Sequence, residues 1–425
     1  MVVRRSNGDV VESFGSSREV TAPEHEITMT MNGPHQPTNP WAPLTPEQQE
    51  ARKVVNVNAE TVTNTAATDI PGHYGPEQDD SWNLERFRDN FRIDFHHNKP
   101  HDAAFSLVGC DASISNAFRR ILLAEVPTLA IEDVFMFNNT SIIQDEVLSH
   151  RIGLIPLTGG EKGLRWLRWF RKKPPTDDFA SQAAYDADGE PSTPSDYNTV
   201  VLELKVDCRW ATEAEDGRDG KKLAKEGETD PNVRYVNSNV YARDFRFLPQ
   251  GQQGTYFSGD DAIRPVNPDI LIAKLRPGQK IHLQCHCIKG VGMDHAKFSP
   301  VATASYRLLP QITITSPILG ADAKKFARCF PKGVIGLEPS DESDPDSEPK
   351  AVVKDPMKDT VSRECLRHDE FKGKVKLGRI RDHFIFSVES TGQLRSDELF
   401  LDSVRLLKAK TERFKRHLAE FEEGR

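Results

Sequence analysis

The sequence predicts an α+β fold, in which helices and strands are mixed without a regular β–α–β repeat. Three observations lead to this prediction. An amphipathic helix and an alternating strand follow each other directly between residues 111 and 137. Several separate strand-like segments then lie between residues 200 and 388, and a second amphipathic helix closes the chain at 397–418. No internal repeat is visible.

The first helix is predicted by its apolar spacing. Its apolar residues recur at i, i+3, i+4, i+7 and i+8: Ile114, Ala117, Phe118, Ile121 and Leu122. This spacing places them on one stripe of a helix. Asp111 or Ser113 can cap its start, and Pro127 prevents its continuation past Val126.

A strand and a second apolar segment follow this helix. Leu129, Ile131, Phe135 and Phe137 alternate until the Asn138-Asn139 turn. The segment from Ile142 to Ile155 is again mostly apolar. No nucleophile with a neighbouring base occurs here, so the region is typical of an assembly element and not of a catalytic pocket.

The later elements are shorter, apart from the last helix. Order is expected to begin near Trp82, and strands are predicted at 104–108, 200–206, 301–309 and 384–388. Two further strands, 270–275 and 280–288, are joined by a Pro-Gly turn. Ser396 caps the last helix, whose apolar side consists of Phe400, Val404, Leu407, Phe414 and Leu418.

The composition indicates a soluble protein of the cell interior. The net charge of −8 over 425 residues argues against a free-standing nucleic-acid binder, because phosphate contacts need clustered Lys and Arg. Six scattered cysteines do not form a disulfide framework. The N-terminus lacks the apolar core of a signal peptide, and no apolar run is long enough to span a membrane.

Two long motifs give the chain a family resemblance. They read Asn116-Ala117-Phe118-Arg119-Arg120-Ile121-Leu122-Leu123 and His150-Arg151-Ile152-Gly153-Leu154-Ile155-Pro156-Leu157. Their segment resembles the dimerisation motif of RNA polymerase alpha-type subunits. The resemblance runs from about Val62 to the C-terminus and includes 294–301 and 376–379. Within that family, the pattern fits the large alpha-like subunit shared by eukaryotic RNA polymerases I and III.

The resemblance implies a discontinuous alpha-type dimerisation domain interrupted by a mostly β insert domain. On this basis residues 1–81 form a largely disordered N-terminal tail. Residues 82–157 and 296–425 form the two parts of the dimerisation domain, and 158–295 form the insert. The second part would include a degenerate ferredoxin-like region at about 320–370 and the C-terminal helix.

The resemblance also implies a non-catalytic assembly subunit. It pairs the chain with the smaller alpha-like polymerase subunit through Ile114, Ala117, Phe118, Ile121 and Leu122. At least one of Arg119 and Arg120 would contact the second-largest subunits of polymerases I and III, where a planar multi-donor guanidinium suits an interface. On pattern alone, however, an amphipathic stripe is more often buried against its own domain.

Further partners and a location follow from the same resemblance. The small shared polymerase subunits are expected partners, whereas DNA and RNA are reached only indirectly through the complex. The complex would make ribosomal RNA, 5S ribosomal RNA and transfer RNA for ribosome biogenesis. The expected location is therefore the nucleus, both nucleolus and nucleoplasm.

Several residues look like metal ligands, but no metal or other cofactor is predicted. On a strand, Cys285 and Cys287 share the face of Ile281 and Leu283, whereas His282 and His286 point to the other face. One tetrahedral ion cannot collect both faces, so the cysteines are interpreted as core. Cys329 and Cys365 are too few for an iron–sulfur cluster.

Two rival functions remain open. The run 164–173 interleaves aromatic and basic residues, which can bind nucleic acid. A short amphipathic helix with a solvated basic edge is the more ordinary interpretation. The polymerase II type of alpha-like subunit has a cysteine-rich zinc loop after the second motif. No cysteine lies between Cys110 and Cys208 here, which favours the polymerase I and III form.

Overall fold

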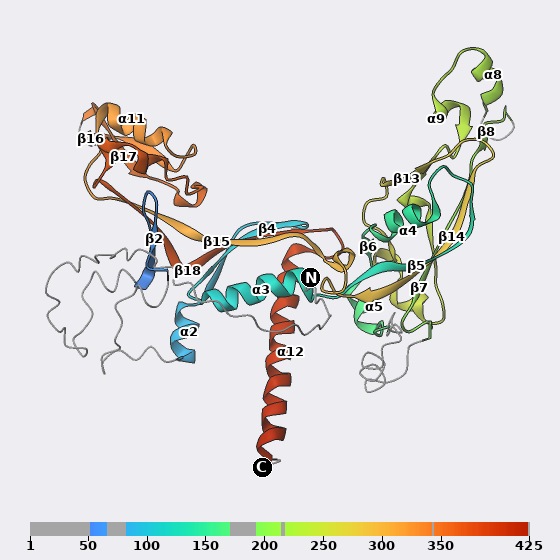
Figure 1. The fold of residues 1–425 in the computed structure, drawn as a ribbon, viewed down its shortest axis with the longest axis horizontal. Helices are drawn as coiled ribbons and strands as arrows, with labels where there is room; N and C mark the ends of the chain where they lie inside the picture. The colour runs from blue at the N-terminus through green and yellow to red at the C-terminus, as the bar shows by residue number, and fades with distance from the viewer. Residues whose placement is uncertain (1–51, 66–81, 171–192, 214–216, 342–343, 424–425) are drawn as a thin grey trace, which may run out of the picture. The chain divides into compact units, whose positions relative to one another are not determined.

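The computed structural model describes residues 52–65, 82–170, 193–213, 217–341 and 344–423. It contains both helices and sheets, as the α+β prediction requires (Figure 1). Two sheets dominate the described residues, and both are antiparallel. The predicted tail residues 1–51 and 66–81 lie outside the described part of the chain.

The larger sheet, here called sheet A, collects strands from both ends of the sequence. Its strands are β1 (Val54–Val57), β2 (Val62–Thr63), β3 (Arg92–Lys99), β4 (Asp102–Val108), β15 (Val301–Ile314) and β18 (Val375–Ser390). The strand order is β2-β1-β18-β4-β3, and β15 pairs with β18. β18 is the organising strand, because it pairs with β15 on one edge and with β1 and then β4 on the other.

The N-terminal part of sheet A differs from the predicted tail 1–81. Val54 pairs with Ile380 and Val57 with Leu377. Val57 is buried, and the β-branched sequence Val-Val-Asn-Val suits a strand. The sequence did not predict β1, because its partner β18 lies more than three hundred residues later in the chain. Local sequence patterns carry no information on pairing over such a separation.

One face of sheet A is covered by helices α3 (Ala112–Ala124) and α12 (Ser396–Glu423), and their core is rich in phenylalanine (Figure 1). Phe105 of β4 stacks on Phe386 of β18 with 5.4 Å between ring centroids. Phe400 of α12 contacts Phe105 at 4.6 Å and Phe118 of α3 at 5.4 Å. The aromatic rings therefore join the sheet to both helices.

The second sheet, here called sheet B, consists of β5 (Thr128–Asn139), β7 (Val200–Asp207), β11 (Phe245–Leu248) and β14 (Lys280–Gly290). Its order is β11-β7-β14-β5. Helix α4 (Asp145–Gly153) buries Leu148 and Ile152 in the same core. The predicted boundary at 157/158 therefore does not separate two cores, because residues 129–157 pack with 200–287.

A β-bulge changes which face of β5 is apolar. Ile131 pairs with Cys287 and Asp133 with His286, so Glu132 is an extra residue. After the bulge, Val134 and Met136 point to the core, whereas Phe135 and Phe137 are exposed. The simple alternation expected from Leu129 to Phe137 is wrong at this point, because the bulge inverts the parity.

A third core lies around the far end of β15 and β18. It includes helix α11 (Gly320–Arg328) and the hairpin of β16 (Ile335–Asp341) and β17 (Asp344–Val353). Phe326 and Phe371 are fully buried there, with ring centroids 5.2 Å apart. This module occupies the predicted region 320–370.

The remaining elements are short. The helices are α2 (Leu84–Asn90), α5 (Glu161–Trp166), α8 (Gly220–Lys225), α9 (Pro231–Arg234) and α10 (Gln253–Tyr256). The strands are β6 (Leu157–Thr158), β8 (Arg209–Trp210), β9 (Tyr235–Val236), β10 (Asn239–Tyr241), β12 (Arg264–Pro265) and β13 (Leu271–Lys274). The 3₁₀ turns are η2 (Ala242–Asp244), η3 (Gly259–Asp261), η4 (Ala296–Phe298), η5 (Pro356–Lys358), η6 (Glu364–Arg367) and η7 (Asp369–Phe371).

Candidate interaction surface

Helix α3 forms where the apolar spacing predicts it. The Asp111 side chain accepts a hydrogen bond from the Ser113 backbone N–H at 2.9 Å, so Asp111 is the N-cap. This hydrogen bond and that from the Ser113 hydroxyl lower the pKa of the Asp111 carboxyl. The helix ends at Ala124, two residues before the Val126-Pro127 break.

Most of the α3 stripe is buried within the chain itself. Phe118 is 7% exposed, Ile121 2% and Leu122 0%. They pack against β4, β15, β18 and α12 in the core of sheet A. Only Ile114 and Ala117 are partly exposed. Phe118, Ile121 and Leu122 are therefore covered by the chain itself, as an amphipathic stripe often is.

The two arginines of the motif differ from each other. Arg119 is half-buried and donates to Asn116 Oδ1 from Nε at 3.1 Å and from Nη2 at 2.9 Å. Arg120 is exposed, and the structure describes no hydrogen bond or ion pair for it. Arg120 is thus the one of the pair whose guanidinium is open to another chain, while Arg119 is held on its own helix.

An open apolar stripe lies on α12, which the sequence did not indicate as a site. Apolar residues follow the heptad spacing of a coiled coil: Phe400, Val404, Leu407, Phe414, Leu418 and Phe421. Phe400 is buried, but Phe414 is 66% exposed and Leu418 47%. Residues 408–422 are exposed throughout (Figure 1).

The base of α12 is fixed firmly to the rest of the chain. Leu399 and Phe400 are buried, and Lys410 Nζ lies 2.6 Å from Glu125 Oε2 just after α3. Beside this base, the edge strand β3 exposes Phe95 by 49%, and its ring lies 5.3 Å from that of Phe105. The buried ring of Phe105 thus links the exposed Phe95 of β3 to Phe400 at the base of α12.

The cysteines of β14 lie in the core, as the strand periodicity predicts. Cys285 and Cys287 are fully buried with Ile281 and Leu283. Burial raises the pKa of the Cys285 thiol to about 12, so it carries a proton at neutral pH. His282 faces the other way, with Nε2 3.3 Å from Glu203 Oε1, and His286 contacts the Phe135 ring. In the described part of the chain, no cluster of His, Cys, Asp and Glu is arranged to hold a metal ion.

The basic-aromatic run is largely occupied by internal contacts. Trp166 stacks on Tyr256 at 4.5 Å, Leu167 is buried, and Arg165 pairs with Glu161. Residues 171–173 lie outside the described residues. The described part of the run thus matches a packed segment with a solvated edge better than an open stacking platform.

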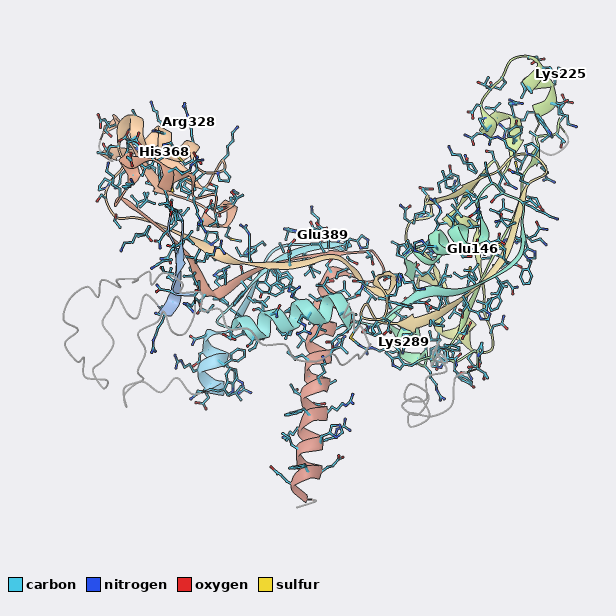
Figure 2. The ribbon with its side chains drawn as sticks, in the orientation of Figure 1. Glu146, Lys225, Lys289, Arg328, His368 and Glu389 are labelled. Carbon is cyan, nitrogen blue, oxygen red and sulfur yellow. The ribbon has the colours of Figure 1, made fainter. Side chains whose placement is uncertain are left out.

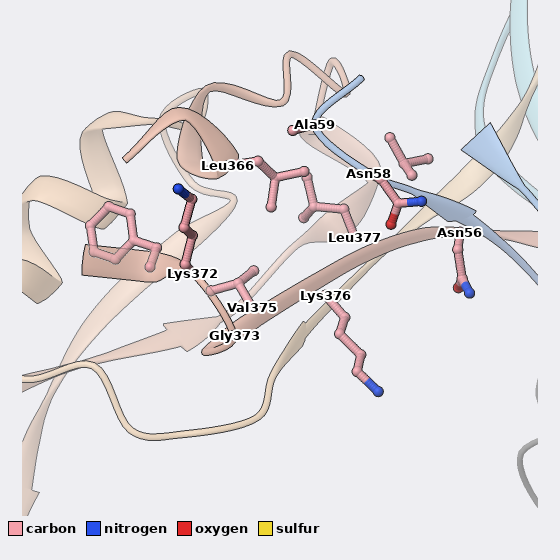
Figure 3. Close-up of a pocket in the computed structure, with 11 residues that line it drawn as sticks. Asn56, Asn58, Ala59, Leu366, Lys372, Gly373, Val375, Lys376 and Leu377 are labelled. Carbon is pink, nitrogen blue, oxygen red and sulfur yellow. The ribbon is translucent and has the colours of Figure 1, made fainter. Parts of the chain in front are cut away.

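A cavity of about 540 Å³ lies between the β1–β2 turn and residues 366–377 (Figure 3). Its lysines, Lys372 and Lys376, extend in opposite directions and do not converge on one point. Neighbouring Cys329 and Cys365 are free, buried thiols. Burial raises the pKa of Cys365 to about 12. This arrangement offers neither a thiolate nucleophile nor a converging set of charges.

The fold, the buried motif helix and the open apolar stripe on α12 are typical of a subunit of a larger assembly. Within the ranges that the structure describes, no set of side chains is arranged as a catalytic site. The family model of the RNA polymerase Rpb3/Rpb11 dimerisation domain matches residues 104–411, and the chain belongs to this family. Among the described residues, no helix is long and apolar enough to cross a membrane.

Curated relatives agree with this family. The chain is 49% identical to the Saccharomyces cerevisiae subunit RPAC1 of DNA-directed RNA polymerases I and III, over 85% of this chain and 97% of that protein. It is 44% identical to the Homo sapiens RPAC1 subunit, over 86% and 95%. Subunit 3 of Arabidopsis thaliana polymerases II, IV and V is more distant, at 31% identity over 72% and 85%.

Proposed function

We propose that this chain is the alpha-like assembly subunit shared by RNA polymerases I and III. The observation that carries the proposal is near full-length similarity to subunits named for those two enzymes, at 44–49% identity. The polymerase II-type relative is clearly less similar. Nucleotide transfer belongs to the complex, and this subunit contributes structure to it.

The proposed heterodimer surface combines α12 with the rim of sheet A. The smaller alpha-like subunit would cover Phe414 and Leu418, and also Ile114 and Ala117 on α3. Phe118, Ile121 and Leu122 would contribute indirectly, because their burial holds α3 against sheet A. The heptad spacing supports a helical partner, because a and d positions pack against another helix. The discontinuous domain plan belongs to the same proposal. Residues 103–126 pack with 301–400 in the core of sheet A, whereas residues 129–157 pack with the insert.

Later assembly would use the motif arginines. The exposed guanidinium of Arg120 supports a contact with the second-largest subunits of polymerases I and III, since arginine suits polar interfaces. Arg119 would orient this region through Asn116. A nuclear location fits a polymerase subunit, and the nucleolus is proposed as the site of the polymerase I fraction.

Affinity purification with mass spectrometry tests the proposal. The tagged full-length chain should recover the smaller alpha-like subunit and the large subunits of both polymerase I and polymerase III. Polymerase II subunits serve as the matched comparison and should be absent. Recovery of polymerase II subunits in place of the other two, or of RNA without polymerase subunits, would contradict the assignment.

A further inference from the structure

Two family motifs that are far apart in the sequence meet at one place in the structure. His150 and Leu154 lie at the end of α4, in the second motif, and His295 and Lys297 belong to the 294–301 segment. All four line one cavity of about 250 Å³ together with Glu132 of β5. None of these residues lies in α3 or α12.

This cavity continues into two others. Glu132, His295 and Lys297 also line a cavity of about 380 Å³ that reaches Trp169 and Lys289. Leu154 is also shared with a cavity of about 220 Å³, whose walls include Ile270 and Ile272. Because neighbouring cavities share lining residues, the three adjoin one another, and they are here called the groove, with Lys289 in its polar part and Ile270 in its apolar part.

The polar part holds a cation without a carboxylate partner in the described residues. Lys289 is only 9% exposed, and Nζ donates to the Leu164 carbonyl at 3.0 Å and to the Leu167 carbonyl. Figure 2 labels Lys289, which lies near the end of β14. Trp169 covers it, with Nζ 4.9 Å from the ring centroid. Burial lowers the pKa of Lys289, which is the direction expected for an ammonium that lacks a counter-ion.

His295 adds a second donor in this part. Its Nδ1 accepts the Lys297 backbone N–H at 3.1 Å, so the neutral ring carries its proton on Nε2. Lys297 and Glu132 neutralise each other, with Nζ and Oε2 2.5 Å apart. Asp294 also lines this cavity, but it is exposed, where solvent screens its charge.

The apolar part is open. Leu154, which lines two of the three cavities, is 49% exposed. Arg151 is occupied by the Leu271 carbonyl, which Nη2 reaches at 3.0 Å. An occupant of this part therefore meets aliphatic carbon and no free arginine. That chemistry favours a polypeptide over a nucleic acid, which needs clustered cations.

We propose that the groove docks an extended acidic segment of another polypeptide, with a carboxylate at Lys289 and His295 and aliphatic side chains over Leu154. The proposal goes beyond the proposed function, because it concerns a surface separate from α12. An incoming carboxylate would give the buried Lys289 the counter-ion that the described residues do not supply, and it would meet His295 at the solvent-exposed rim of the same cavity.

Fluorescence polarisation with labelled peptides tests the groove on the full-length chain. The probes are a peptide of alternating glutamate and leucine, the same peptide with lysine for glutamate, and a uridine oligonucleotide. The acidic peptide should bind, and Leu154→Asp or His295→Asp should weaken it by about tenfold or more. Aspartate still caps η4, so His295→Asp removes the donor and adds a like charge without removing the cap.

Leu337→Asp is the matched control, since Leu337 is an equally exposed leucine on β16 and should leave binding unchanged. Lys289→Met keeps the aliphatic stem and should also weaken binding, provided that its melting curve matches the parent. Four outcomes would overturn the proposal. They are equal binding of the acidic and basic peptides, tighter binding of the oligonucleotide, no measurable binding of any probe, and unchanged binding by both Leu154→Asp and His295→Asp. Recovery of the smaller alpha-like subunit by the same variants reports separately on the proposed function.

Discussion

Phe118 of α3 and Phe414 of α12 occupy similar positions in two amphipathic helices, but their environments are opposite. Phe118 is 7% exposed and packs against Phe400, whereas Phe414 is 66% exposed. Both stripes have helical spacing and similar residues. The comparison teaches that periodicity identifies an apolar stripe but not the surface that covers it, whether the same chain or another one.

The comparison predicts first that Phe118→Ala damages the fold. Removing a buried aromatic side chain should lower the free energy of unfolding by about 3–5 kcal/mol. Chemical denaturation of the full-length chain measures this. Phe414→Ala is the matched control and should change stability by no more than about 0.5 kcal/mol, since exposed positions contribute little. Equal losses for both variants would show that α12 is covered within the chain.

Phe414→Glu should act on association instead. A charge on the stripe should weaken the heterodimer with the smaller alpha-like subunit by about 2 kcal/mol, roughly thirtyfold, if Phe414 is a central contact. Competition between tagged and untagged chains for that subunit measures the ratio. Arg416→Ala changes the opposite side of the same helix turn and should have little effect. An unchanged affinity for Phe414→Glu would exclude the stripe as the interface.

The face of sheet A opposite α3 and α12 carries a polar cluster. Ser106 is fully buried, and its hydroxyl lies 2.8 Å from His96 Nε2 and 2.9 Å from His383 Nε2. Burial first, and then Arg92, lower the pKa of His383, with Asp382 and Asp94 opposing and His96 adding to the shift. Because the unfolded chain then binds the proton more readily, the stability from His383 is present above its ordinary pKa of 6.5 and is lost as the pH falls below it.

Ser106→Ala should therefore lower stability by about 1 kcal/mol at pH 8. The difference between variant and parent should shrink as the pH falls below 6, because a protonated His383 Nε2 can donate to the Ser106 hydroxyl but can no longer accept a hydrogen bond from it. Urea midpoints from pH 5 to pH 8 give this difference. A pH-independent difference would mean that the hydroxyl acts through packing alone.

The smallest effect concerns the thiols of β14. Burial raises the pKa of the Cys285 thiol to about 12 and that of the Cys287 thiol well above its ordinary value, so neither forms a reactive thiolate at pH 8. Iodoacetamide should leave both unmodified in the folded chain and modify both after denaturation, as peptide mass spectrometry can follow. Rapid labelling in the folded chain would show that sheet B opens.

Local patterns predicted the elements better than their surroundings. The spacing from Ile114 to Leu122 and the cap at Asp111 gave helix α3, and strand parity gave the buried face of β14. The same patterns misplaced Phe135 and Phe137, because the bulge at Glu132 arises from pairing with β14 and has no local signal.

The site was harder to predict than the fold. The motif led to the prediction of an interface on α3, whose apolar stripe is mostly buried within the chain. It did not indicate Phe414 and Leu418 on α12, which are exposed. Hydrophobicity alone could not separate these two cases, since the burial of α3 depends on Phe400 and Phe386 nearly three hundred residues later. The heptad spacing of α12, extended beyond Leu418 to Phe421, was the one signal that could have indicated an open stripe.

The route of the chain through its sheets sets the order in which the newly made protein can fold on the ribosome. Every strand of sheet B lies between residues 128 and 290, but sheet A is complete only when β18 ends at Ser390. At about 5–20 residues per second, the intervening stretch of roughly a hundred residues takes about 5–20 s to synthesise. During that time Phe105 and Phe118 lack their packing partners Phe386 and Phe400. The N-terminal part of the nascent chain therefore exposes apolar side chains until the C-terminal part has been synthesised, and chaperone binding would protect it from aggregation most in this interval.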